Sequence, residues 1–168
     1  MMFISYIGIL ISLIITLPNV IYFILPVRNR PVGLCRNSKI FNAFEIVGRV
    51  LCIASPVFSG FKFNSASLNI WFWLMSGCIV AYYCLWFRYV FGNMEFNLLY
   101  KPIFKISVPM AVFLILAFIF AGLWIGSKFI ICSALIFGIG HYANSIFIYE
   151  QCTPHQKTDS PAEISSAH

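Results

Sequence analysis

The chain has 168 residues, of which 61% are hydrophobic, 18% are aromatic and only 10% are charged. A soluble domain has about 45–50% apolar and about 25% charged residues, and a small soluble fold leaves too much surface exposed to hide this many apolar side chains. The composition therefore excludes a water-soluble globular protein and predicts one compact, lipid-solvated domain. The formal net charge of +6 comes mostly from residues between apolar runs. It indicates membrane topology and no nucleic-acid partner.

Five apolar stretches have the length of about 20 residues that a transmembrane helix needs. They cover residues 3–25, 41–61, 67–87, 106–126 and 129–149. The first stretch carries no charge and is too long for the apolar core of a cleaved signal peptide, so we expect it to be retained. Together these stretches predict an all-α fold, an integral membrane bundle of five transmembrane helices spanning residues 1–149.

The loops between the spans differ in charge. With five spans, one side of the membrane holds seven basic residues: Arg28, Arg30, Arg36, Lys39, Arg88, Lys101 and Lys105. The other side holds Lys62 and Lys128. Because basic loops stay in the cytoplasm, this asymmetry predicts the N-terminus outside and the C-terminus in the cytoplasm. Residues 150–168 are polar and rich in serine and proline, so we expect a disordered cytoplasmic tail.

Aromatic and small residues suggest how the spans meet lipid and each other. Tyr82, Tyr83 and Trp86 close the third span, and we expect them to form part of an aromatic belt at headgroup level. Two pairs of small residues four positions apart occur in the last two spans and predict close helix packing. These pairs are Gly122 with Gly126 and Ala134 with Gly138.

Polar residues inside the spans predict one polar centre. Glu45 and Arg49 are four residues apart, a spacing at which a carboxylate and a guanidinium meet on one helical face. An ionisable residue within a span is costly, so it is by default a candidate functional site. At about 1.5 Å per residue, Arg49 and His141 both lie roughly 12 Å from the predicted cytoplasmic face. Asn19 and Asn144 fall in the same layer, which predicts that all five side chains are buried together.

Each member of this centre has two interpretations. Glu45 and Arg49 either form a structural ion pair or bind a substrate, an ion or a lipid headgroup. His141 either packs with a hydrogen bond to Asn19 or to a carbonyl, or it accepts a proton or holds a ligand, since histidine titrates near neutral pH. For Asn144 the simpler expectation is an interhelical hydrogen bond.

Motifs for metal, cofactor or catalysis are not found. The six cysteines form no CxxC pair and no zinc spacing, so we expect neither a metal nor a cofactor. Glu45 is the lone carboxylate within the predicted spans, and neither a phosphate-binding glycine loop nor HExxH occurs. An intramembrane enzyme is therefore the least favoured of the functions considered.

Three short motifs carry a resemblance. Pro18-Asn19 in the first span, Glu45-x-x-Gly48-Arg49 in the second and Gly140-His141 in the last resemble a family of small uncharacterised multi-pass integral membrane proteins of bacteria. The resemblance covers most of the spanning region and leaves out the tail. It implies location in the inner (plasma) membrane and says little about chemistry.

Three functions follow from these observations. The leading one is a non-enzymatic multi-pass membrane protein that serves as a subunit of a larger assembly, with the lipid bilayer and either a second copy or another membrane protein as partners. The alternative is a small transporter or permease-like protein with its polar centre at Glu45, Arg49 and His141. The third is an intramembrane enzyme that uses His141 and Glu45.

Overall fold

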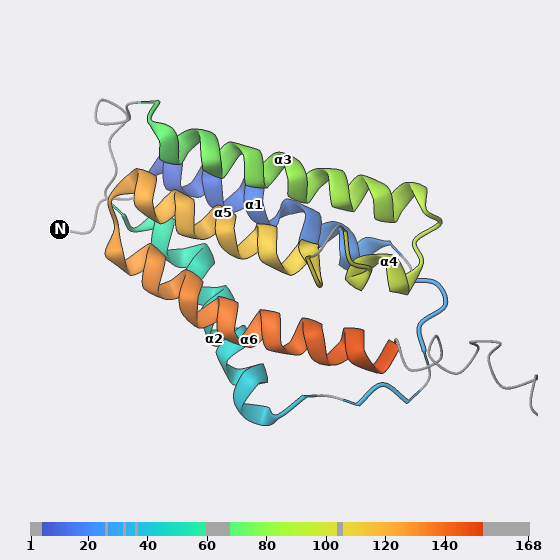
Figure 1. Ribbon diagram of the computed structural model, residues 1–168. Helices are drawn as coiled ribbons and strands as arrows, with labels where there is room; N and C mark the ends of the chain where they lie inside the picture. Colours follow the sequence, from blue (N-terminus) through green and yellow to red (C-terminus); the bar gives the residue numbers. More distant parts are fainter. Residues whose placement is uncertain are drawn as a thin grey trace, which may run out of the picture.

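The computed structural model describes residues 5–25, 27–31, 33–35, 37–59, 68–103 and 106–152. Over these ranges the chain forms six helices and no β-sheet, so the predicted all-α class is confirmed there (Figure 1). The helices are α1 (Tyr6–Ile24), α2 (Lys39–Val57), α3 (Ile70–Phe91), α4 (Phe96–Tyr100), α5 (Pro109–Ile125) and α6 (Lys128–Cys152). Most of the predicted tail lies outside the described residues, and residues 150–152 continue α6.

Three of these helices, α2, α3 and α6, are long and apolar enough to cross a membrane. The apolar stretches Tyr6–Val20 of α1 and Pro109–Ile125 are shorter. Many of the side chains that these helices expose are apolar, as expected for a surface in contact with lipid. Examples are Leu13, Val50, Trp73, Val80 and Leu135, each more than half exposed.

Local sequence explains where the helices begin and end. The Ser38 hydroxyl accepts a hydrogen bond from the Ile40 amide at 3.2 Å, and the Asn69 side chain accepts from the Trp71 amide at 3.1 Å. Both are N-cap contacts that satisfy free amides at the first turn of a helix. Pro109 begins α5, as expected for a residue without an amide hydrogen. Gly126 ends α5 with φ of 74°, a conformation that favours glycine.

The helices run alternately up and down and pack in the order α3, α5, α6, α2, with α1 beside α2 (Figure 1). Near the start of α1, the Ser5 amide donates to the Val57 carbonyl at 2.8 Å and the Ser12 hydroxyl to the Ile53 carbonyl at 3.1 Å. Away from these contacts α1 and α2 diverge (Figure 1). The end of α1 and the beginning of α2 therefore lie apart (Figure 1).

Backbone hydrogen bonds join the loop after α1 to the turn before α4. The Arg28 amide donates to the Met94 carbonyl, and the Phe96 amide donates to the Arg28 carbonyl, both at 3.0 Å. Phe96 and Leu99 of α4 are 2% and 8% exposed and pack into the bundle. The segment following α3 thus covers one end of the helices instead of presenting all its aromatic side chains to the membrane.

Candidate functional site

Two glycines set the crossing of α2 and α6. A Cβ atom on Gly140 of α6 would overlap the α2 backbone at Phe41 and Glu45, and one on Gly48 of α2 would overlap the α6 backbone at Phe137. Only glycine lets the two backbones approach this closely. The crossing therefore places Glu45 directly against α6.

Glu45 is the hub of the polar centre. Its Oε1 accepts from Arg49 Nη2 at 2.5 Å and from His141 Nδ1 at 3.1 Å, and its Oε2 accepts from Asn144 Nδ2 at 2.5 Å. The Asn144 amide also donates to Asn42 Oδ1 at 3.1 Å. The structure thus contains the ion pair expected from the four-residue spacing, and it adds two donors from α6. Three donors thus compensate the charge of the Glu45 carboxylate, whose side chain is 18% exposed.

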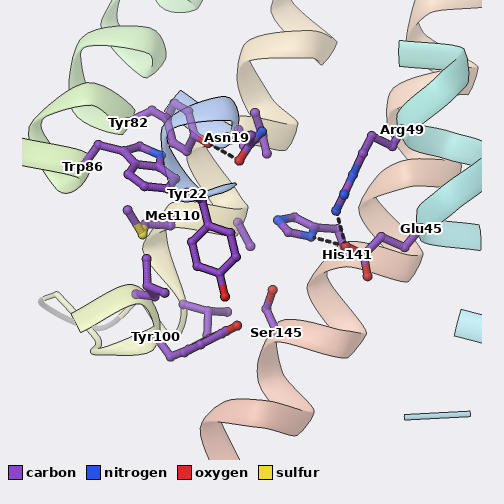
Figure 2. Close-up of a pocket in the computed structure, with 14 residues that line it drawn as sticks. Asn19, Tyr22, Glu45, Arg49, Tyr82, Trp86, Tyr100, Met110, His141 and Ser145 are labelled. Carbon is purple, nitrogen blue, oxygen red and sulfur yellow. Dashed lines mark hydrogen bonds and ion pairs between the residues drawn. The ribbon is translucent and has the colours of Figure 1, made fainter. Parts of the chain in front are cut away.

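His141 is oriented by two contacts. Its ring stacks on Phe137 with ring centroids 4.8 Å apart, and its Nδ1 faces Glu45. Because an ionised carboxylate can only accept, Nδ1 carries the hydrogen and Nε2 is left for another partner. Figure 2 shows the ring between Glu45 and Asn19, on the cavity side of the carboxylate. Its partner is therefore Glu45, and not the Asn19 or carbonyl partner considered from the sequence.

Asn19 lies across the cavity from this cluster. Its Oδ1 accepts from the Tyr82 hydroxyl at 2.9 Å, which links α1 to α3. Asn19 lines the same cavity as Glu45, Arg49 and His141 (Figure 2). Of the five predicted residues, the structure therefore joins four directly and places Asn19 on the facing wall.

The cavity has a volume of about 230 Å³ and lies between α1, α2, α3, α5 and α6, with α4 at one side. Polar groups converge on it from an otherwise apolar and aromatic wall (Figure 2). Such a lining is typical of small-molecule sites. The residues that line it are Asn19, Tyr22, Glu45, Arg49, Tyr82, Trp86, Leu99, Tyr100, Val108, Met110, Ala111, Leu114, His141 and Ser145.

The aromatic lining corrects one expectation. Tyr82 and Trp86 were expected in a belt at the membrane surface, but they are 2% and 7% exposed and lie inside the bundle. Their spacing in the sequence indicates burial, because residues 78, 82, 85, 86 and 89 fall on one helical face, and all of them are buried. A belt residue keeps its polar tip in the wet interface, whereas the Tyr82 hydroxyl is bonded to Asn19.

A second cavity of about 450 Å³ adjoins the first. The two share Tyr22, Glu45 and Tyr100. The second is lined by Arg30 and Cys35 of the loop after α1, both exposed, and by Asn42 and Asn144 near the crossing. The Glu45 carboxylate therefore separates an inner cavity from an outer one that reaches the loop end of the bundle.

Two groups in the inner cavity have unused donors. The Trp86 indole nitrogen is buried and close to the Tyr82 hydroxyl, but it makes no hydrogen bond to any described residue. Among described residues, the Arg49 guanidinium bonds to Glu45 alone, and its side chain is 48% exposed. A buried donor without an acceptor is costly, so the unpaired Trp86 nitrogen beside the cavity points to a further partner.

Val108 adds local strain to the cavity wall. It immediately precedes Pro109, is 1% exposed and has φ of 49°. A β-branched residue rarely adopts this left-handed conformation. Strained backbone of this kind is enriched at functional sites.

The predicted packing residues have different roles. A Cβ on Gly122 would press on Ile130 and Ile131 of α6, Gly138 faces Ile115 of α5, and Ala134 is fully buried. Gly126 has no neighbour at its Cβ position and serves as the cap of α5. The closest approaches instead involve Gly48 and Gly140, with Gly8 against the Pro56 carbonyl.

Within the described part of the chain, no cluster of three or more histidine, cysteine or acidic side chains could hold a metal ion. Comparison of the chain with known protein families, with curated proteins and with solved structures finds no match. Any function must therefore be inferred from the geometry of the site itself.

Proposed function

We propose that the chain is a multi-pass membrane protein that binds a small polar ligand in the inner cavity beside Glu45. In this proposal five helices, α1, α2, α3, α5 and α6, span the plasma membrane, with the N-terminus outside and the C-terminus in the cytoplasm. Three long apolar helices and the two shorter ones packed with them support the span count. The described residues Arg28, Arg30, Arg88 and Lys101 at one end support the orientation.

The observation that carries the proposal is the convergence of unsatisfied donors on a cavity inside the bundle. A purely structural ion pair would be closed and fully bonded, because an unpaired donor in lipid is costly. Here Glu45 is saturated by three donors, while Arg49 and His141 retain nitrogen atoms for a further partner. Glu45 therefore organises the site, and Arg49 and His141 face the ligand.

This geometry favours the permease-like alternative over a subunit with a purely structural polar centre. Glu45 itself would be a poor general base, because its carboxylate already accepts three hydrogen bonds. A role in a larger membrane assembly stays a prediction, as does the resemblance to small bacterial membrane proteins.

Native mass spectrometry of the protein purified from its own membranes tests the proposal. Ala111 lines the cavity and is 2% exposed, so Ala111→Phe should fill it, whereas Val112→Phe on the same helix lies outside the lining. We expect a retained small molecule or lipid on the wild type and on Val112→Phe, and its loss from Ala111→Phe.

A second cavity variant, Ser145→Leu, keeps the test valid if Ala111→Phe does not fold, because Ser145 lines the cavity from α6. Thermal unfolding in detergent shows which variants are folded. A wild-type protein that retains no ligand, or equal retention by folded cavity variants and by Val112→Phe, contradicts the proposal.

A further inference from the structure

The ligand class follows from the donors in the inner cavity. The nitrogens that lack a protein partner there belong to Trp86 and Arg49, and His141 adds its Nε2. For Asn19, whose oxygen is bonded to Tyr82, no hydrogen bond from the amide nitrogen is seen among the described residues. Three donor groups of this kind, with His141 Nε2 as a fourth when the ring is protonated, favour an acceptor-rich partner, and a guanidinium matches the oxygens of a phosphate or a carboxylate.

An anion is compatible with the nearby Glu45 because the Glu45 charge is already compensated. Both of its oxygens are engaged, one by Arg49 and His141 and the other by Asn144. Arg49 lines the inner cavity, so its remaining donors are available to an anion there. When His141 is protonated, the cluster of Glu45, Arg49 and His141 carries a net charge of about +1, which favours an anion in a site of low dielectric.

The fixed tautomer of His141 couples anion binding to a proton. With Nδ1–H directed at Glu45, a neutral ring presents a bare Nε2, which repels an anionic oxygen, and a protonated ring presents Nε2–H, which donates to it. The titratable groups that face the same cavity are Glu45 and Arg49 of α2, Tyr22 of α1, Tyr82 of α3 and Tyr100 of α4. The α5 wall is apolar, so the protonation state of His141 decides whether a donor or a bare nitrogen faces the anion.

Two features of the inner cavity bear on the source of the anion. Arg49 lines it with a side chain that is 48% exposed, and the neighbouring Ile46, Val50 and Ile53 are exposed apolar residues, as at a lipid-facing surface. The outer cavity is lined by the exposed Arg30 and shares Glu45 with the inner one. The site therefore fits an anionic group that arrives on a lipid headgroup or from water.

Resting on the proposed function, we infer that the inner cavity binds an anionic oxygen group, a phosphate or a carboxylate, through Arg49, Trp86 and protonated His141. Glu45 is the positioning residue that holds Arg49 and His141 for this contact. Binding takes up one proton at His141.

Ligand binding to the full chain in neutral detergent, followed by native mass spectrometry, tests this inference. The probes are phosphatidic acid, a long-chain fatty acid and inorganic phosphate, with phosphatidylcholine as the zwitterionic comparison. We expect the anionic probes to bind, and to bind more tightly at lower pH, because the protonated His141 ring donates to the anion. His141→Gln should bind weakly and with no dependence on pH.

Variants that remove the same charge distinguish binding at the site from non-specific electrostatic attraction of anions to a basic protein. Arg49→Gln should weaken binding about tenfold or more, because it removes a charge-assisted contact. Lys101→Gln removes an equal charge from an exposed position outside both cavities and should have little effect. Trp86→Phe removes one donor while it keeps an aromatic ring, so it reports on the site even where Arg49→Gln does not fold.

The outcomes are distinct. Competition of phosphatidic acid by inorganic phosphate identifies a water-borne anion, and its absence identifies a lipid headgroup; both support the inference. Equal binding by Arg49→Gln, Trp86→Phe and Lys101→Gln overturns it. A wild type that retains a neutral ligand from its membranes and binds no anion also overturns it, but leaves the proposed function intact.

Discussion

At the scale of residues, the organisation of the site depends on Glu45. Its carboxylate joins α2 to α6 by accepting hydrogen bonds from His141 and Asn144, besides that from Arg49 on its own helix. The Glu45 side chain is 18% exposed, whereas that of Arg49 is 48% exposed. The two members of the ion pair therefore contribute unequally to the stability of the bundle.

Glu45→Ala should lower the free energy of unfolding by about 3 kcal/mol, because it leaves buried donors on His141 and Asn144 without their acceptor. Arg49→Ala should cost about 1 kcal/mol or less, as for an exposed pair. Titration with SDS in mixed micelles measures both values. Glu95→Ala is the control, since the exposed Glu95 makes no side-chain cap contact.

The double change of Glu45 and Arg49 to leucine sharpens this test. If the carboxylate served Arg49 alone, removal of both charges would restore much of the stability lost in the single Glu45→Leu variant. Because Glu45 also serves α6, we expect the double variant to be about as unstable as the single one. Recovery to within about 1 kcal/mol of wild type would show that the contacts from α6 contribute little.

The pairing of Glu45 with Arg49 could be predicted because it is local: a spacing of four brings two long side chains together on any helix. The contacts of His141 and Asn144 depend on how α2 and α6 cross, which periodicity does not determine. Depth along the helices predicted that His141, Asn144 and Asn19 lie in one layer. Asn19, however, accepts a hydrogen bond from Tyr82 instead of bonding to Glu45. Depth gives the height of a residue and leaves its direction around the helix open.

At the scale of elements, the α2–α6 contact depends on glycines whose role is not visible in a small-residue pattern. Gly122 and Gly126 look equivalent in the sequence, but only Gly122 lies against α6, because α5 ends at Gly126. The motif Gly140-His141 does not reveal the role of Gly140 in the crossing, which depends on its neighbours Phe41 and Glu45 on α2. A spacing motif predicts that helices pack and does not select the glycines at the crossing.

Gly140→Ala should destabilise the protein by about 2 kcal/mol or more, since its Cβ would meet the backbone of α2, which cannot yield as a flexible side chain can. Gly77→Ala is the matched control, because Gly77 lies within α3 with open space at its Cβ position. There the helix propensity of alanine should stabilise by about 0.5–1 kcal/mol. The same SDS titration measures both, and equal effects would contradict the close crossing.

At the scale of the whole molecule, apolar composition predicted a helical membrane protein, and the described residues are helical with three candidate spans. The five predicted spans correspond in position to α1, α2, α3, α5 and α6, although α3 and α6 run several residues further than expected. Hydropathy locates an apolar segment but does not mark its last helical turn. Helix α4 was missed because five residues are too few for a periodic pattern.

The proposed orientation predicts which loops meet the cell exterior. In a variant whose six native cysteines are replaced, Lys128→Cys should react in intact cells with a thiol reagent that cannot cross membranes. Asn93→Cys should react only after the cells are opened. Both positions are exposed and lie at opposite ends of the bundle. Reaction of both in intact cells contradicts five spans, and the reverse pattern contradicts the orientation.

The most direct test of the central claim, that Glu45 holds His141 with Nε2 towards the cavity, is the tautomer of His141 in lipid bilayers. Solid-state ¹⁵N NMR can observe it alone once His155 and His168 are changed to asparagine, which leaves His141 as the one histidine. When the ring is neutral, we expect a protonated Nδ1 and a bare Nε2, and Glu45→Gln should disturb this preference. A protonated Nε2 with a bare Nδ1 would show that Glu45 does not orient the ring.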